Sequence, residues 1–181
     1  AVLFAASEPV GREGLTRVVG RGCALDLLIE DISAELAGRP YEIARIAGGW
    51  QFRTRPQHAG AIRVARGEGD ATRDLTASEA LVLTIVAYMQ PVTRGAISRL
   101  AGREVSRDLI ARLHRQALIA RGPRSPEPGA PYTYVTTPGF LVQFGLVTLR
   151  DLPDLEALED AGLLKPAADV ELDLPIAGES E

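Results

Sequence analysis

The sequence is poor in the residues that build reactive and metal sites. It holds a single cysteine, Cys23, and two histidines, His58 and His114, in 181 residues. One cysteine cannot form an internal disulfide, and two distant histidines do not make a histidine-rich metal site. A Walker loop, a dinucleotide-binding glycine fingerprint and a nucleophile elbow are also missing. We therefore expect that the protein is not an enzyme and that it has no catalytic residues, no cofactor and no bound metal.

Long apolar runs are missing as well. No stretch is long enough to cross a bilayer, and the N-terminus lacks the basic region, apolar core and cleavage site of a secretory signal. Hydrophobic residues still make up 46% of the chain, enough for two compact domains of roughly 70 to 85 residues. The sequence therefore predicts a cytoplasmic protein with no membrane partner.

Basic charge comes almost entirely from arginine, since Lys165 is the single lysine, and the net charge is −4 at pH 7. Residues 166–181 carry five carboxylates and no basic group, so the rest of the chain has a net charge of +1. We expect this acidic tail to be disordered. A nearly neutral body is not typical of a strong nucleic-acid binder, so we expect weak or non-specific DNA binding at most.

One short pattern occurs twice, 82 residues apart. Residues 9–20 (PVGREGLTRVVG) align without a gap on residues 91–102 (PVTRGAISRLAG). The proline, the valine, both arginines and the last glycine coincide. A period this long indicates two related domains rather than a solenoid, whose units run about 20 to 50 residues.

The surroundings of each copy predict the same order of elements. In the first half, helices over residues 12–19 and 24–36 follow a short apolar start, and strands over 41–46 and 50–54 are joined across Gly48-Gly49, a pair suited to a tight hairpin.

In the second half, Thr76 and Glu79 are spaced as a capping box that opens a buried helix, and Ser106 can cap a later one. Strands over 118–121 and 132–136 then flank a proline-rich wing. Phe140 and Phe144, in a last short helix, are expected to pack on their own domain.

These elements predict a mainly α protein with small β-hairpins (α+β), built from two tandem winged-helix domains. We assign an N-terminal domain to residues 1–66, a linker to 67–74, a C-terminal domain to 75–165 and the acidic tail to 166–181.

Two surfaces are candidates for contacts with other molecules. Around the third helix of the second domain, arginines gather as a candidate DNA or partner surface: Arg103, Arg107, Arg112 and Arg115. We favour a solvated or partner-facing surface over DNA there, since the body of the chain is nearly neutral, and the acidic third helix of the first domain argues further against DNA. The chain begins with an apolar segment that we expect to be buried in a contact with a second copy. Its residues are the candidate dimer contacts: Val2, Leu3 and Phe4.

Four segments resemble the hallmark stretches of the segregation and condensation protein B (ScpB) family. They are residues 46–56 (IAGGWQFRTRP), residues 75–94 (LTASEAL at the start, IVAYMQPVTR at the end), residues 131–146 (PYTYVTTPGFLVQFGL) and residues 149–155 (LRDLPDL). The resemblance runs in order from about residue 2 to residue 164. The chain departs from the family pattern in its shortened first helix, its long wing and its charged tail.

This resemblance implies a non-enzymatic subunit of the bacterial condensin-like SMC complex, acting in chromosome condensation, chromosome partition and the cell cycle. Proteins of this family form homodimers through the N-terminal winged helix and bind the kleisin subunit, ScpA, through the C-terminal one. The kleisin contacts the SMC ATPase, so SMC is an indirect partner, and the expected location is the cytoplasm at the nucleoid. The alternative is a tandem winged-helix transcription regulator, which should present a basic third helix with base-reading side chains.

Overall fold

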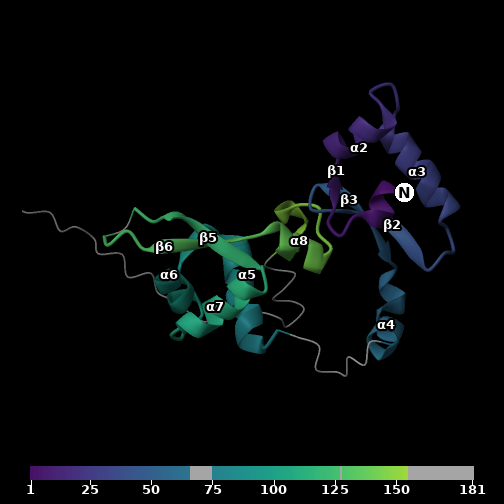
Figure 1. Cartoon of the computed structure of the whole chain (residues 1–181). Coiled ribbons are helices and arrows are strands. Elements are labelled where there is room, and N and C mark those ends of the chain that lie inside the picture. The colour runs from purple at the N-terminus through teal and green to yellow at the C-terminus, as the bar shows by residue number, and fades with distance from the viewer. Residues whose placement is uncertain (66–74, 127, 155–181) are drawn as a thin grey trace, which may run out of the picture. The chain divides into compact units, whose positions relative to one another are not determined.

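The computed structural model describes residues 1–65, 75–126 and 128–154; Figure 1 draws the others in grey. The proposed linker and acidic tail lie outside the described residues. The described residues form a mixed α/β structure with two three-stranded antiparallel sheets, one in each half of the chain. Within this part of the chain, no helix is both long enough and apolar enough to span a bilayer.

The N-terminal half begins with a short helix and a two-residue strand. Its elements, in chain order, are α1 (Val2–Ala5), β1 (Val10–Gly11), α2 (Arg12–Val19), α3 (Leu25–Glu35), β2 (Tyr41–Ile46) and β3 (Gly49–Thr54). The strands are ordered β1-β3-β2, so β3 is central. A 3-10 turn (Pro56–His58) and the helix α4 (Ala59–Ala65) follow. Sequence analysis missed α4, which lies inside the N-terminal domain that we assigned.

The tight turn of the first hairpin lies one residue earlier than expected. Ala47 and Gly48 have φ values of 48° and 74° and form the turn, whereas Gly49 is the first residue of β3. A Cβ on Gly49 would lie 2.8 Å from the carbonyl oxygen of Val10. Gly49 must therefore lack a side chain for β1 to approach closely. The turn is formed by the two residues before it, of which Gly48 readily adopts a positive φ.

The core of the N-terminal half is small. Leu15, Leu25 and Trp50 are buried, and partly buried side chains pack around them: Leu3, Val10, Ile29 and Ile43. Leu15 and Leu25 come from α2 and α3, and Trp50 from β3, so the cluster joins the helices to the central strand.

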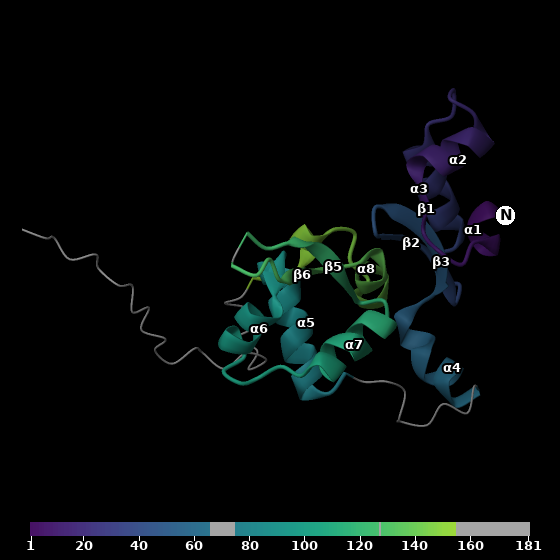
Figure 2. The ribbon, with the colours of Figure 1, turned by 60° about the vertical axis from the view of Figure 1, so that its left-hand side comes forward.

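The C-terminal half repeats this order with a longer first helix. Its elements are α5 (Ala77–Met89), β4 (Val92–Thr93), α6 (Arg94–Leu100), α7 (Arg107–Arg115), β5 (Ile119–Arg124), β6 (Tyr132–Thr136) and α8 (Pro138–Phe144), followed by a 3-10 turn (Leu149–Asp151). Both views show α5, α6 and α7 on the same side of the β5–β6 hairpin (Figures 1 and 2). The strands are ordered β4-β6-β5.

Helix α5 is apolar around its circumference and is the centre of the second core, as expected. Val82 and Val86 have no exposed surface, and Ile97, Leu113 and Ile119 from three other elements are almost completely buried. The second half therefore has the larger hydrophobic core.

The repeated sequence pattern corresponds to a repeated structural unit. In each half a two-residue strand leads directly into a short helix: β1 into α2, and β4 into α6. Each short strand pairs with the second strand of the following hairpin. Sequence analysis missed both short strands because two residues are too few to show a period.

The end of the second half differs from expectation at two points. Strand β5 runs to Arg124, so the loop of the wing is shorter than the segment 122–131 that we predicted. Phe140 is buried, with 4% of its surface exposed, whereas Phe144 is 47% exposed and touches Phe140 with a ring separation of 4.9 Å. The expectation that both rings pack in the core is correct only for Phe140, because Phe144 is the last residue of α8 and lies beyond the buried part of the helix.

The capping box at the start of α5 is present. The Thr76 hydroxyl accepts a hydrogen bond from the Glu79 main-chain N–H at 3.2 Å, and the Glu79 carboxylate accepts from the Thr76 N–H at 2.9 Å. Its other oxygen lies 3.1 Å from the Arg112 guanidinium on α7. The two hydrogen bonds from Thr76, assisted by Arg112 and opposed by burial, hold the pKa of Glu79 below its ordinary value of 4.5.

We expect Glu79→Gln to lower the free energy of unfolding by about 1 kcal/mol at neutral pH, since it weakens a cap. Because folding lowers the pKa of Glu79, its carboxylate stabilises the fold above the ordinary pKa and loses this effect as the pH falls through the folded value. The difference in melting temperature between wild type and variant should therefore shrink below about pH 4.5. Thermal denaturation followed by circular dichroism measures it.

The matched control is Glu104→Gln, a carboxylate with 87% of its side chain exposed. It should leave the melting temperature within experimental error at each pH. A Glu79→Gln difference that stayed constant from neutral to strongly acidic pH would contradict the assigned role of the carboxylate.

Candidate functional site

The four arginines that we named as one surface separate into different environments. Arg107 and Arg115 line a groove of about 670 Å³ between α7 and the β5–β6 hairpin. Arg112, three residues before Arg115 on the same helix, points to Glu79 and belongs to the cap of α5. Arg103 is exposed in the turn after α6 and does not line this groove.

The groove gathers basic side chains from several elements. Arg107, His114 and Arg115 come from α7, Arg94 from the start of α6, and Arg121 from β5. Leu109 and Leu113 of α7 are buried and do not line the groove, so they fix which face of the helix is exposed. Sequence analysis missed Arg94 as a member, because Arg94 lies on a different helix, α6.

Arg94 is held in place by the turn that precedes α7. Its Nη1 donates to the Val105 carbonyl oxygen at 2.9 Å and lies 3.7 Å from the Glu104 carboxylate. The Ser98 hydroxyl accepts from the Val105 main-chain N–H at 3.0 Å, which fastens the same turn to α6. The wall of the groove formed by α6 and α7 is thus a braced structure.

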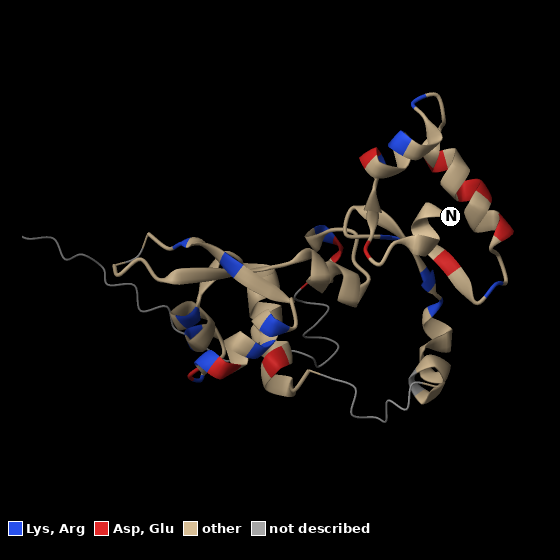
Figure 3. Ribbon diagram, in the orientation of Figure 1, with Lys and Arg blue, Asp and Glu red and all other residues tan. Residues whose placement is uncertain are grey.

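The two halves differ in the charge of their outer helices. Figure 3 shows acidic residues along α3, whereas Lys and Arg positions mark α6, α7 and the hairpin of the C-terminal half. On α3 the acidic residues are Asp26, Glu30, Asp31 and Glu35. The α3 surface is therefore unsuited to phosphate, and the basic face belongs to α7.

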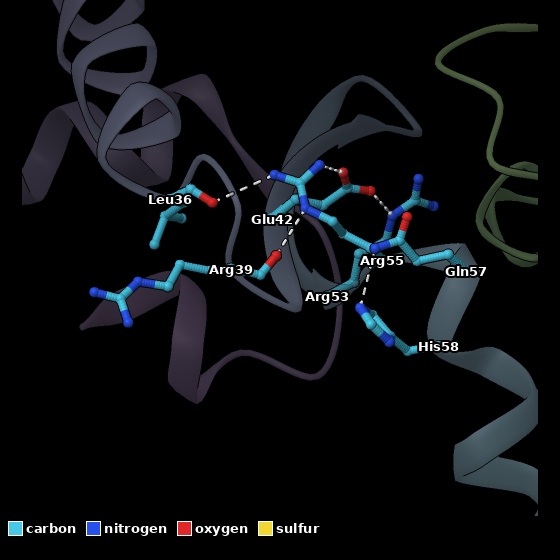
Figure 4. Close-up of polar contacts among 7 residues, drawn as sticks. All are labelled: Leu36, Arg39, Glu42, Arg53, Arg55, Gln57 and His58. Carbon is cyan, nitrogen blue, oxygen red and sulfur yellow. Dashed lines mark hydrogen bonds and ion pairs between the residues drawn. The ribbon is translucent and has the colours of Figure 1, made fainter.

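One hallmark segment has a structural role that is visible in its contacts. Arg53, on β3, and Arg55, directly after the end of β3, bracket Glu42 (Figure 4). Arg53 Nε donates to one carboxylate oxygen at 3.1 Å and Arg55 Nη1 to the other at 2.9 Å. Arg55 also donates through Nε to the Arg39 carbonyl oxygen at 2.9 Å and through Nη2 to that of Leu36 at 3.4 Å. The side chain of Arg55 thereby ties the end of α3 and the following loop to the hairpin.

Trp50, in the same segment, is buried between charged neighbours. The guanidinium groups of Arg12 and Arg45 lie 5.3 and 5.8 Å from the centre of its ring. Arg12 also donates to both oxygens of Asp26, at 2.6 and 2.8 Å, and so links α2 to α3. Cation–π contacts of this kind add to the burial of the indole.

We expect Arg55→Gln to lower the free energy of unfolding by about 1 to 3 kcal/mol, because two main-chain carbonyls and Glu42 lose a charged donor. The measurement is a chemical denaturation curve. Arg39→Gln is the control, since Arg39 contributes only its main-chain oxygen to this network and its exposed side chain should matter by less than about 0.5 kcal/mol. Equal losses in the two variants would contradict the role of the Arg55 side chain.

The three candidate dimer residues lie on α1 in unequal environments. Leu3 packs against the core of the N-terminal half. Val2 is partly exposed, and Phe4 is 77% exposed with its ring edge-on to Phe52 at 5.6 Å. Of the three, Phe4 presents the largest free apolar surface.

Across the described ranges, no group of three or more His, Cys, Asp and Glu side chains is placed to hold a metal ion.

Comparison with known proteins identifies the family. The model of the family described as "Segregation and condensation complex subunit ScpB" matches residues 1–155. The chain belongs to this family. Its match extends over both halves and includes the arginine groove, the Glu42 network and α1.

Proteins named segregation and condensation protein B are similar to this chain over most of its length. The one from Desulforamulus reducens is 37% identical over 161 residues, which cover 86% of each chain. The one from Syntrophotalea carbinolica is 36% identical over 86% of this chain and 79% of its own. The one from Symbiobacterium thermophilum is 34% identical over 92% of this chain and 76% of its own.

Two solved structures are similar in sequence. ScpB from Mycobacterium tuberculosis is 26% identical and a conserved hypothetical protein from Chlorobium tepidum is 32% identical. Each likeness covers 80% of this chain and 91% of the other, with TM-scores of 0.40 and 0.38. TM-scores of this size do not support the fold, which rests on the elements described above.

Proposed function

We propose that this member of the ScpB family is a non-enzymatic subunit of a bacterial SMC complex that acts in chromosome condensation and segregation. It binds the kleisin subunit, ScpA, through its C-terminal half and pairs with a second copy through its N-terminal half. The SMC ATPase is then an indirect partner that hydrolyses the ATP, and the complex acts in the cytoplasm at the nucleoid. Family membership over residues 1–155 is the observation that carries this proposal.

The C-terminal half offers an apolar surface for a partner segment. Phe144, at the end of α8, is half exposed, and Leu149, in the 3-10 turn that follows, is 38% exposed. Phe144 rests on buried Phe140, so its ring is held in position rather than free to collapse. A fixed, exposed aromatic ring is the kind of residue that anchors interfaces.

We expect the full chain, immobilised through a tag, to capture the kleisin and, through it, SMC from a lysate of its own organism. Mass spectrometry identifies the captured proteins. Binding that buries apolar anchors should change little between low and physiological salt. Phe144→Ala should weaken capture of purified kleisin by at least about tenfold, while its melting temperature stays close to that of wild type.

Leu100→Ala is the matched control, because Leu100 is an exposed apolar residue on α6 with a similar exposed fraction. It should leave kleisin binding unchanged. Capture of a specific promoter in place of kleisin and SMC would favour the tandem winged-helix regulator instead.

Self-association rests on the exposed apolar surface of α1. We expect the full chain to be a dimer at micromolar concentration, and Phe4→Asp to shift it to monomer, because an isologous contact places the new charge on both sides. Sedimentation equilibrium measures the mass. Leu100→Asp adds the same charge in the other half and should remain dimeric. A monomeric wild type would rule out this mode of pairing.

A further inference from the structure

Apart from Arg94, which braces the turn before α7, the arginines of the groove between α7 and the β5–β6 hairpin have no role in the proposed kleisin contact at α8 or in an ion pair of the described fold. We propose that this groove is a sequence-independent binding surface for the phosphate backbone of duplex DNA. The inference goes beyond the proposed function, because it assigns a second partner to a different part of the C-terminal half.

The groove holds arginines that no carboxylate neutralises. Arg107 and Arg115 are exposed, and none of the described carboxylates forms an ion pair with either. Arg121 lies over the Tyr132 ring, 4.9 Å from its centre, which orients its guanidinium without cancelling the charge. Among the described residues of the C-terminal half, Arg112 pairs with Glu79 outside the groove, and the groove residue Arg94 lies 3.7 Å from the exposed Glu104. Free guanidinium groups that line one groove are suited to phosphate, which they bind through paired N–H donors.

The elements around the groove are also arranged in a way that suits binding of a long polyanion. Helices α6 and α7 are joined by a short turn, and α7 is the second helix of this pair, the position that enters the major groove in helix-turn-helix proteins. The β5–β6 hairpin carries Arg121 and Tyr134 on the other wall. A helix beside a basic hairpin forms an open surface that can contact the phosphates of both strands of a duplex. A compact anion would need an enclosed pocket instead.

The exposed face of α7 carries few side chains that read bases. Arg107, Ala111, His114 and Arg115 line the groove; this set lacks the asparagine and glutamine side chains that read adenine, and its arginines bind either guanine or phosphate, so two duplexes of unrelated sequence are compared below. The net charge of +1 outside the acidic tail makes the expected affinity modest. Such a surface adds contacts to a complex that is already at the chromosome.

The test measures binding of the full chain to a fluorescein-labelled duplex of about 40 base pairs by fluorescence anisotropy, between about 50 and 200 mM KCl. We expect wild type to bind two duplexes of unrelated sequence equally well. Arg107→Gln with Arg115→Gln should weaken binding to both and reduce the slope of log K against log salt by about 2, near 1 for each lost phosphate contact. Arg107→Lys with Arg115→Lys should restore most of the slope, since lysine also binds phosphate as a point charge.

The matched control is Arg39→Gln with Arg99→Gln, which removes the same charge from exposed side chains outside the groove. Its slope should equal that of wild type. Equal reductions in the control and the groove variant would overturn the proposal, because overall charge would then explain the binding. A preference of more than about a hundredfold for one duplex would overturn sequence independence.

The acidic tail, residues 166–181, is the alternative ligand for the groove. A variant that neutralises the tail by Asp169→Asn, Glu171→Gln and Asp173→Asn distinguishes binding of DNA from binding of the tail. If wild type fails to bind at about 50 mM salt and only the neutralised variant binds, the groove belongs to the tail and the proposal is overturned. Kleisin capture by the groove variant should remain at the wild-type level.

Discussion

The fold of each half depends on the pairing of a two-residue strand with the second strand of a hairpin. In the first half Val10 pairs with Trp50, and in the second Val92 pairs with Tyr134. A helix begins at the next residue after each short strand, so this pairing sets where the helix starts and which face it turns to the sheet. In the first half the pairing is possible only because Gly49 has no Cβ to meet the Val10 carbonyl. The repeated proline and valine mark the same junction twice.

This constraint explains why the side chains of residues 46–56 stabilise the fold and do not form a reactive site. Trp50 fills the core beside the short strand, and Arg53 and Arg55 hold Glu42 while Arg55 fastens the loop after α3. A core with few buried side chains leaves little stability to lose, so polar contacts around it matter more than usual. The residues of this segment are therefore explained by their structural contacts, without a ligand.

The two halves have the same order of elements but different surfaces. The first has a small core, an acidic α3 and an exposed phenylalanine on α1; the second has a large core, a basic α7 and an exposed phenylalanine on α8. A small core beside exposed apolar surface suits self-association, and a well-filled core can carry exposed charge and an aromatic anchor. Duplication of one unit thus allows separate contacts for separate partners.

The sequence by itself determined what local physics controls: the capping box at Thr76, the helix capped by Ser106, both hairpins and the repeat of one short pattern. These follow from residues within a few positions of one another, where spacing and side-chain hydrogen bonding decide the outcome. Only the tertiary structure decided that Arg112 turns to Glu79 while Arg107 and Arg115 join Arg94 and Arg121, and that Phe140 is buried while Phe144 is exposed. Neighbours on one helix separate in this way because contacts with distant segments, which no local pattern encodes, fix the environment of each face.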